Sequence, residues 1–391
     1  MVYATADVTG ERLRVGMVGG GRDAFIGAVH RMGLRLDDQA VLVAGALSSD
    51  PERAQSSGTD LGLAPDRIYS DYAEMARAES ARPDGIELVA IVTPNHLHAD
   101  VAKAFLNAGI DVICDKPLTT TPQDADDLVA LTATTGLVFA VTLTNAGYAM
   151  VRQMREMVTG GAIGNLRGIH TAYLQDWLSL PVDADGLKQA AWRTDPAQAG
   201  PSAVLADIGV HAYHLASYVT GLTAEKVAAD LSTAVPGRRL DDNANVLIRW
   251  QGDIPGTLNA SQTAPGHLND LTLHVYGDKG GLSWCSLTPE ILHHTPIGGP
   301  TRILARGAAG TTPEAMATGR IPPAHPEGTI EAFGTLYRDA IQMVRARRAG
   351  TTTDRAQWLP DVVAGAQGVH FVEASVNSSQ KEGRWTPVKP V

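Results

Sequence analysis

The chain has 391 residues, of which 44% are hydrophobic and 19% charged, which is the composition of a globular protein with length for two or three domains. Its formal net charge of −10 and its lack of Lys/Arg-rich runs argue against nucleic acid and anionic membranes as partners. No apolar run reaches the roughly 18 residues of a membrane span, and the first residues lack the features of a signal peptide. The two cysteines, Cys114 and Cys285, suggest no disulfide framework. The sequence therefore predicts a cytoplasmic protein.

The first 144 residues alternate between apolar segments and helical segments. The apolar segments, which we expect to form buried strands, are 13–20, 40–47, 87–94, 110–117 and 137–144. Helices are predicted between them, for example over 98–109 and over 119–136, where an N-cap, an early proline and a closing glycine occur together. This alternation predicts an α/β domain over 11–144, with a doubly wound parallel sheet.

From residue 145 to 391 the pattern changes. A helix over 150–161 leads into the segment 166–177, and a second helix is predicted over about 203–220. Strand-like segments then follow one another at 226–235, 245–250, 256–264, 271–277 and 280–285. We expect a long loop over 296–326 and a helix over 327–348. Consecutive strands joined by tight turns predict an α+β domain with a large, open, mostly antiparallel sheet and helices on one face.

A glycine-rich turn follows the first predicted strand. Gly19 and Gly21 match the first two glycines of G-x-G-x-x-G, and Ala24 takes the third position, although Gly27 fits if the loop is three residues longer. Glycines allow the backbone to approach a pyrophosphate, which the following helix N-terminus stabilises. The turn therefore predicts a dinucleotide cofactor, with Arg22, Phe25 and Ile26 also in contact with it.

The second predicted strand ends without the usual acidic residue. In many dinucleotide sites an acidic residue at this position bonds the adenosine ribose. Here Ser48 and Ser49 occupy the position. Serine can bond a ribose hydroxyl and does not repel a 2′-phosphate, for which Arg22 or Arg53 could supply the positive partner. We expect NAD, and NADP stays an alternative.

Polar residues follow two further strands at the predicted carboxyl edge of the sheet. Pro117 stiffens the chain directly after Lys116, so this lysine is held at a strand end, where open α/β sheets bind ligands. The earlier strand ends in the segment TPNHLH, whose Asn95 can bond ribose or phosphate. The predicted cofactor contacts at this edge are Thr93, Pro94, Asn95, His98, Asp115 and Lys116.

Four motifs occur in order: VGGG, TPNHLH, CDKP and LADIGVHAYH. Together they resemble the glucose–fructose oxidoreductase, inositol dehydrogenase and rhizopine catabolism (Gfo/Idh/MocA) family of NAD(P)-dependent sugar and polyol dehydrogenases. The resemblance implies a Rossmann domain joined to a domain whose open sheet often forms the oligomer interface, hence a homodimer or homotetramer. It also implies a catalytic trio of Lys116, Asp207 and His211, with Lys116 touching the substrate hydroxyl and the nicotinamide ribose.

The residue types of this trio suit oxidation of a secondary alcohol. Hydride transfer requires a base for the hydroxyl proton, and histidine, with a pKa near 6.5, suits that role. Asp207 and His211 are four residues apart, so we expect them on one helix face. His214 stands where many family members carry an acid and is predicted to bind a substrate hydroxyl. No further ligand joins Asp207, His211 and His214, so no metal is expected.

Further substrate contacts are expected from the second domain. Aromatic faces and bidentate polar groups suit a sugar ring, and the chain offers them in TNAGY, YLQDWL and AAWRTDP. The predicted residues are Asn145, Tyr148, Gln175, Trp177 and Arg193, with Asp176 and Trp192 beside them.

The sequence therefore predicts a dehydrogenase that oxidises a ring hydroxyl of a sugar, sugar derivative or cyclic polyol. An alternative on the same fold is an NAD-dependent glycosidase, which oxidises C3 transiently, eliminates the aglycone and re-reduces the sugar. His214 or Tyr148 would suit the additional acid–base step of that reaction. A third reading, a nucleotide-sensing regulator, is disfavoured because Lys116 and the D-x-G-x-H motif are both intact.

Overall fold

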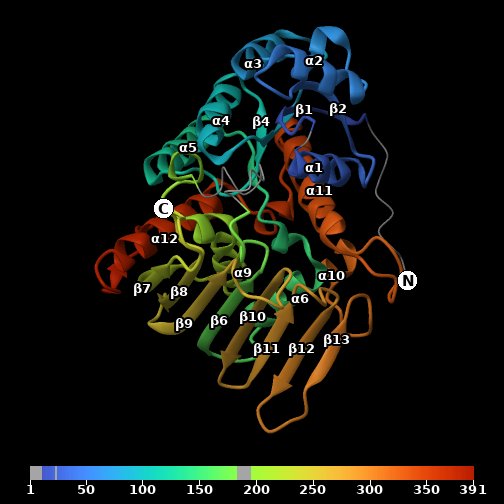
Figure 1. Cartoon of the computed structure of the whole chain (residues 1–391). Coiled ribbons are helices and arrows are strands. Elements are labelled where there is room, and N and C mark those ends of the chain that lie inside the picture. Colours follow the sequence, from blue (N-terminus) through green and yellow to red (C-terminus); the bar gives the residue numbers. More distant parts are fainter. Residues whose placement is uncertain (1–10, 23, 183–194) are drawn as a thin grey trace.

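The computed structural model describes residues 11–22, 24–182 and 195–391. Its N-terminal part is built on a parallel sheet (Figure 1). The strands are β1 (Leu13–Gly19), β2 (Ala40–Ala46), β3 (Leu88–Val92), β4 (Asp111–Cys114) and β5 (Phe139–Val141). Their order is β2-β1-β3-β4-β5, and every neighbouring pair is parallel. The predicted parallel sheet is confirmed. Its strand order reverses between β1 and β3, which is where such sheets bind ligands.

Helices bury both faces of this sheet. They are α1 (Phe25–Arg35), α2 (Pro51–Asp60), α3 (Tyr72–Ala81), α4 (His98–Asn107) and α5 (Pro122–Thr135). The side chains of Asp50, Asp71 and Thr121 accept the N-terminal N–H groups of α2, α3 and α5, the standard way of satisfying a helix start. Alternate residues of β1 and β3 belong to two separate apolar clusters, one on each side of the sheet.

The second sheet has nine strands in the order β13-β12-β11-β10-β6-β9-β8-β7-β14. Their bounds are β6 (Leu166–Leu174), β7 (Ala224–Ser232), β8 (Asn243–Trp250), β9 (Ile254–Ser261), β10 (Asp270–Gly277), β11 (Gly280–Cys285), β12 (Ile291–Pro296), β13 (Arg302–Ala305) and β14 (Thr386–Pro387). Among the described strands of this sheet, only β6 and β9 pair in parallel. The large, mostly antiparallel sheet is thus confirmed. One face is buried and the other is open, as the alternating burial along β8 illustrates.

Helices cover one face of this sheet and connect it to the first (Figure 1). They are α6 (Ala149–Thr159), α8 (Pro196–Ala199), α9 (Val210–Thr220), α10 (Pro313–Thr318), α11 (Thr329–Arg348) and α12 (Val362–Ser379). The last two pack back on the parallel-sheet unit, α11 against α1 and α12 against α5. Two elements from the C-terminal end therefore fix how the two sheets face each other. The proposed division at residues 144 and 145 falls in the short helix η3 (Thr144–Gly147).

The structure corrects parts of the sequence interpretation. The stretch 296–326 is not one long loop, because it contains β13 and α10. Strand β12 was not expected, since its sequence ILHHTP is half polar; it extends the sheet by pairing with β11. Helix α12 was missed because it is buried on nearly all sides and its polar residues, some of them buried, are spread among the apolar ones, which gives no amphipathic pattern. In the described part of the chain, no helix has the length and apolarity to cross a bilayer.

Candidate active site

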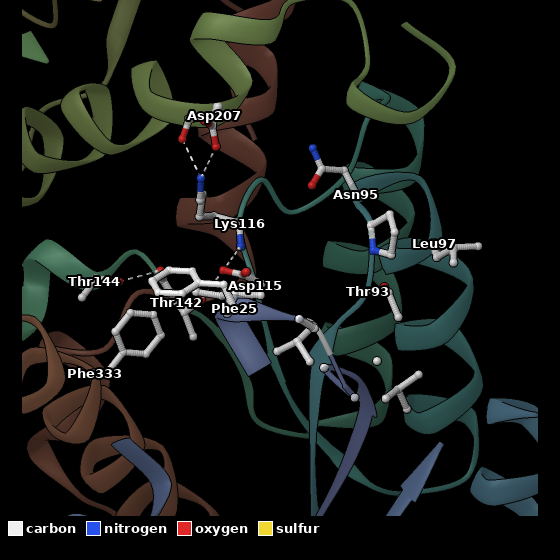
Figure 2. A pocket seen from close by; sticks show the side chains of 18 of the residues that line it. Phe25, Thr93, Asn95, Leu97, Asp115, Lys116, Thr142, Thr144, Asp207 and Phe333 are labelled. Carbon is white, nitrogen blue, oxygen red and sulfur yellow. Dashed lines mark hydrogen bonds and ion pairs between the residues drawn. The ribbon is translucent and has the colours of Figure 1, made fainter. Parts of the chain in front are cut away.

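A cavity of about 1240 Å³ lies at the carboxyl ends of the parallel strands and reaches the second sheet. It is lined by the turns after β1, β2, β3 and β4, by the start of the α9 region, and by residues of and beside β6, β10 and β11. Figure 2 shows the part around Lys116. The volume exceeds the 300–1,000 Å³ typical of a pocket for one small ligand, so there is room for a dinucleotide and a substrate together.

The glycine turn at the end of β1 has the geometry of a close backbone approach. Gly19 and Gly20 have φ of 78° and 71°, in the left-handed region that favours glycine. A Cβ on Gly27 would lie 2.4 Å from the Cα of Gly20, so the first turn of α1 is in direct contact with the loop. Gly27, rather than Ala24, therefore takes the place of the third glycine of the motif, which lets the helix pack closely on the loop. The turn leaves its backbone and the N-terminus of α1 facing the cavity, where a pyrophosphate fits.

The far end of the cavity is formed by the turn after β2. Ser48 and Ser49 line it together with Arg53. Arg22 also lines the cavity, and its guanidinium donates to both carboxylate oxygens of Asp60, at 2.6 and 2.9 Å. The positive charge that a 2′-phosphate would require from Arg22 is thus already engaged by an acid.

Lys116 is anchored on both sides (Figure 2). Its Nζ donates to the carbonyl oxygen of Asp207 at 2.6 Å and to Oδ1 of the same residue at 3.0 Å. Its backbone N–H donates to Oδ1 of Asp115 at 2.8 Å, and Thr142 Oγ1 donates to the same oxygen at 2.9 Å. Because both ends of Lys116 are hydrogen-bonded, its amine is held at a defined place in the cavity wall.

Asp115 is buried beside Lys116 and two histidines. Burial raises the pKa of Asp115, but His30, Lys116 and His98 outweigh that effect and bring the pKa well below its usual range. Nε2 of His30, from α1, lies 4.0 Å from Asp115 Oδ1. Asp115 is therefore a fixed negative charge beneath Lys116.

A π-helical turn, η4 (Leu205–Gly209), carries Asp207 and precedes α9. The sequence predicted one regular helix here. Instead, the wider turn presents both the carbonyl and the carboxylate of Asp207 to Lys116. The second carboxylate oxygen, Oδ2, accepts from Nε2 of Gln262 at 2.8 Å.

His211 lines the same cavity one helical turn further on. Burial and, next, the charge of Lys116 lower the pKa of His211 to about 3, against the opposing charges of Asp207 and Asp115. The imidazole is thus neutral at physiological pH and can accept a proton. Its buried Nδ1 has no hydrogen-bond partner within the described ranges, so here no carboxylate orients the ring.

Most of the predicted site residues meet in this cavity. The predicted residues that line it are Gly19, Gly21, Arg22, Ala24, Phe25, Ile26, Ser48, Ser49, Thr93, Pro94, Asn95, Asp115, Lys116, Asn145, Tyr148, Gln175, Trp177, Asp207 and His211. Their individual roles remain predictions.

Two of the predicted residues that the structure describes do not line the cavity. His98 is fully buried and its ring bonds the carbonyls of Pro117 and Thr93, so it links the two loops instead of facing a ligand. His214 is 5% exposed and its ring lies against Tyr218, behind the cavity wall, which gives no support for a substrate contact. Arg193 lies outside the described residues. Within those residues, no group of three or more His, Cys, Asp or Glu side chains is arranged to hold a metal ion.

The sequence interpretation missed several lining residues on the second sheet. Tyr173 lies on β6 two positions before Gln175, and Asn269 and Ser286 flank β10 and β11. The period of two in a strand could have placed Tyr173 beside Gln175. Asn269 and Ser286 could not be found in this way, because only strand pairing brings their loops to the cavity.

Comparison with known proteins agrees with the architecture. Residues 13–143 match the family model described as an oxidoreductase family with an NAD-binding Rossmann fold, and residues 151–283 match the GFO/IDH/MocA C-terminal domain. An oxidoreductase from Sinorhizobium meliloti is 47% identical in sequence, with a TM-score of 0.87, over 96% of this chain and 99% of that chain.

Two further relatives have named ligands or activities. An inositol dehydrogenase homolog from Azotobacter vinelandii, solved in complex with NADH and myo-inositol, is 34% identical with a TM-score of 0.90, over 98% of this chain and 99% of that one. The levoglucosan dehydrogenase of Pseudarthrobacter phenanthrenivorans is 29% identical over 70% of this chain and 73% of the relative. With both halves matched, the chain belongs to the Gfo/Idh/MocA family of oxidoreductases, whose N-terminal domain is an NAD-binding Rossmann fold.

Proposed function

We propose that this protein is an NAD-dependent dehydrogenase that oxidises a secondary ring hydroxyl of a cyclic polyol or sugar. The observation that carries the proposal is the convergence of Lys116, Asp207 and His211 in a cavity that also contains the glycine turn. The relatives that act on or bind myo-inositol and levoglucosan support the substrate class.

In the proposed mechanism each member of the trio has one task. His211, neutral because burial lowers its pKa to about 3, accepts the hydroxyl proton. Lys116 donates a hydrogen bond to the reacting oxygen and stabilises its developing negative charge. Asp207 holds the lysine amine in place. NAD, held at the glycine turn, would supply the hydride acceptor, and the overall reaction would give a ketone, NADH and a proton.

The remaining predicted contacts divide between cofactor and substrate. The glycine turn, Ser48 and Ser49 would hold the pyrophosphate and adenosine ribose, and Asn95 the nicotinamide half. The Arg22–Asp60 ion pair supports a preference for NAD over NADP, because the arginine charge is already compensated. Facing the nicotinamide end, Asn145, Tyr148, Gln175 and Trp177 would bind the substrate.

The glycosidase alternative needs a second acid–base group for the departing aglycone. His214 is not among the lining residues, and the hydroxyl of Tyr148 is hydrogen-bonded to Thr329 at 3.1 Å. Burial also raises the pKa of Tyr148, so this phenol is a poor proton donor at neutral pH. These observations favour net oxidation.

A panel of polyols, sugars and glycosides, with myo-inositol and levoglucosan included, tests the proposal. Each compound is incubated with the protein and NAD and scored for reduced nicotinamide and for released free sugar. We expect stoichiometric NADH and a keto product, abolished by His211→Asn. Free sugar from a glycoside without net NADH would refute the dehydrogenase and favour the glycosidase.

We also propose a homodimer or homotetramer that associates through the open face of the nine-stranded sheet. Leu247, Tyr276 and Ile303 share that face and are 52%, 47% and 66% exposed. Sedimentation of the wild type and of a Leu247→Lys variant tests this association. A cytoplasmic location is proposed with it, on the basis of the free thiols of Cys114 and Cys285, and cell fractionation tests it.

A further inference from the structure

One buried side chain outside the cavity lining touches the proposed trio. Gln262 follows β9, is 1% exposed, and its Nε2 donates to Oδ2 of Asp207 at 2.8 Å and to Oε1 of Gln175 at 3.3 Å. Its backbone is fixed as well, since its N–H donates to the carbonyl of Asp242 and its carbonyl accepts from Leu178. A buried amide held at both ends is a rigid support for the carboxylate that it contacts.

The hydrogen bonds continue from Gln262 to the cavity wall. Oε1 of Gln175 also accepts from Nε1 of Trp177 at 2.9 Å, while Nε2 of Gln175 donates to Oδ1 of Asn269 at 2.7 Å. The hydroxyl of Tyr173 donates to the same Asn269 oxygen at 2.7 Å. Four of these residues, Tyr173, Gln175, Trp177 and Asn269, line the cavity.

Two groups set the direction of the bonds between these side chains: the carboxylate of Asp207, which only accepts, and the indole N–H of Trp177, which only donates. A carboxylate only accepts, so Gln262 must turn its NH₂ group to Asp207, and that group then also faces Oε1 of Gln175. Gln175 must in turn point its NH₂ group at Asn269, whose oxygen is thereby occupied. Among the described residues the NH₂ group of Asn269 has no partner, so it is available as a donor to the cavity that Asn269 lines.

We propose that Gln262 is a positioning residue for Asp207 and that, through Gln175, it makes Asn269 a hydrogen-bond donor to an acceptor oxygen of the substrate. This inference rests on the proposed function. The recognised group is an oxygen with a free lone pair, such as an ether, ring or hydroxyl oxygen, at the end of the substrate that faces the second sheet. The specificity determinant and the reacting centre are thus parts of one hydrogen-bonded chain.

Gln262→Met tests the positioning role, because methionine is similar in volume but cannot donate. We expect kcat to fall about tenfold to a hundredfold, the effect of misplacing a reacting group. KM should rise less than in Asn269→Asp, because the indole N–H of Trp177 still holds Oε1 of Gln175. The acid limb of the pH profile should move to higher pH, since a Lys116 that Asp207 no longer holds in place lowers the pKa of His211 less. Gln251→Met, at the exposed turn before β9, is the matched control. A merely structural role would lower the melting temperature and leave the pH profile unchanged, which would overturn the proposal.

Asn269→Asp tests the donor, because the side chain keeps its shape and loses its NH₂ group. We expect KM to rise tenfold or more at nearly constant kcat, as for a contact made equally in ground and transition states. An unchanged KM would exclude Asn269 from substrate recognition.

A readout without turnover separates this inference from the proposed function. The indole N–H of Trp177 reports on Gln175, so its ¹⁵N-resolved resonance should shift in Gln262→Met and stay in place in Gln251→Met. If the resonance shifts in a protein that oxidises no compound of the panel, the proposed function is refuted and the proposed series of hydrogen bonds is supported. An unchanged resonance in an active enzyme would refute the proposed series of hydrogen bonds and leave the proposed function intact.

Discussion

Removing the amine of Lys116 is the most direct perturbation of the site. Lys116→Met keeps most of the side-chain volume and deletes two hydrogen bonds to Asp207, at 2.6 and 3.0 Å. Both side chains are 16% exposed, so the pair is screened less than a surface pair. We expect the free energy of unfolding to fall by about 1–3 kcal/mol, the range for an unsatisfied buried polar group.

The effect on catalysis should be larger than the effect on stability. Loss of one positioned electrostatic group lowers kcat by roughly 10²- to 10³-fold, or about 3–4 kcal/mol of transition-state stabilisation. The pH profile should change as well. The charge of Lys116 helps to lower the pKa of His211 to about 3, so removing that charge should raise this pKa and move the acid limb to higher pH.

Steady-state NADH formation measures both effects between pH 9 and about pH 3, where His211 titrates in the wild type. NAD affinity is determined separately by calorimetry. Lys103→Met is the matched control, because Lys103 pairs with Asp124 and Asp127 on the helices outside the cavity. We expect NAD affinity to change by less than about fivefold in either variant. Turnover by folded Lys116→Met within tenfold of wild type would refute the assignment of Lys116 to the reaction.

Three further predictions concern cofactor and stability. Ser48→Asp should sharpen a modest preference for NAD by repelling a 2′-phosphate, and the ratio of kcat/KM for the two cofactors measures it; a strong wild-type preference for NADP would contradict the reasoning. Gly27→Ala should weaken NAD binding tenfold or more in calorimetry, because the new Cβ would lie 2.4 Å from the backbone of Gly20, whereas unchanged affinity would show that the loop can shift freely. Burial, joined at His211 by the charge of Lys116, brings the pKa of His211 and that of His214 to about 3, so the unfolded chain binds protons below pH 6.5 that the native protein does not. The free energy of unfolding should therefore be highest above pH 6.5 and decrease below it, by up to about 1.4 kcal/mol per pH unit for each histidine. In urea unfolding, the free energy of His214→Gln should decrease less steeply with falling pH than that of the wild type. An equal slope would contradict the prediction.

Local sequence patterns were sufficient to predict the strands, helices and turns that form the cofactor half of the cavity. Alternating strands and helices, with a glycine turn after β1, predicted the parallel sheet and the loops at its carboxyl edge. The spacing of Asp207 and His211 predicted a shared helix, yet the π turn between Leu205 and Gly209 has no sequence signature that we could use. Likewise, Gln262 and Asn269 reach the site only because β9 and β10 flank β6, and strand order of this kind depends on contacts distant in sequence.

The π turn at Leu205–Gly209 has a consequence for how this active site can be lost or gained. Its hydrogen bonds span five residues instead of four, so the turn holds one residue more than an α-helical turn. Deleting one residue between Asp207 and His211 would restore an ordinary helix and rotate the preceding residues by about 100° relative to α9. Asp207 would then swing away from Lys116, while His211 and the glycine turn kept their places. A deletion of a single codon could thus convert this enzyme into a protein that still binds dinucleotide but no longer performs the reaction, and the reverse insertion could restore it.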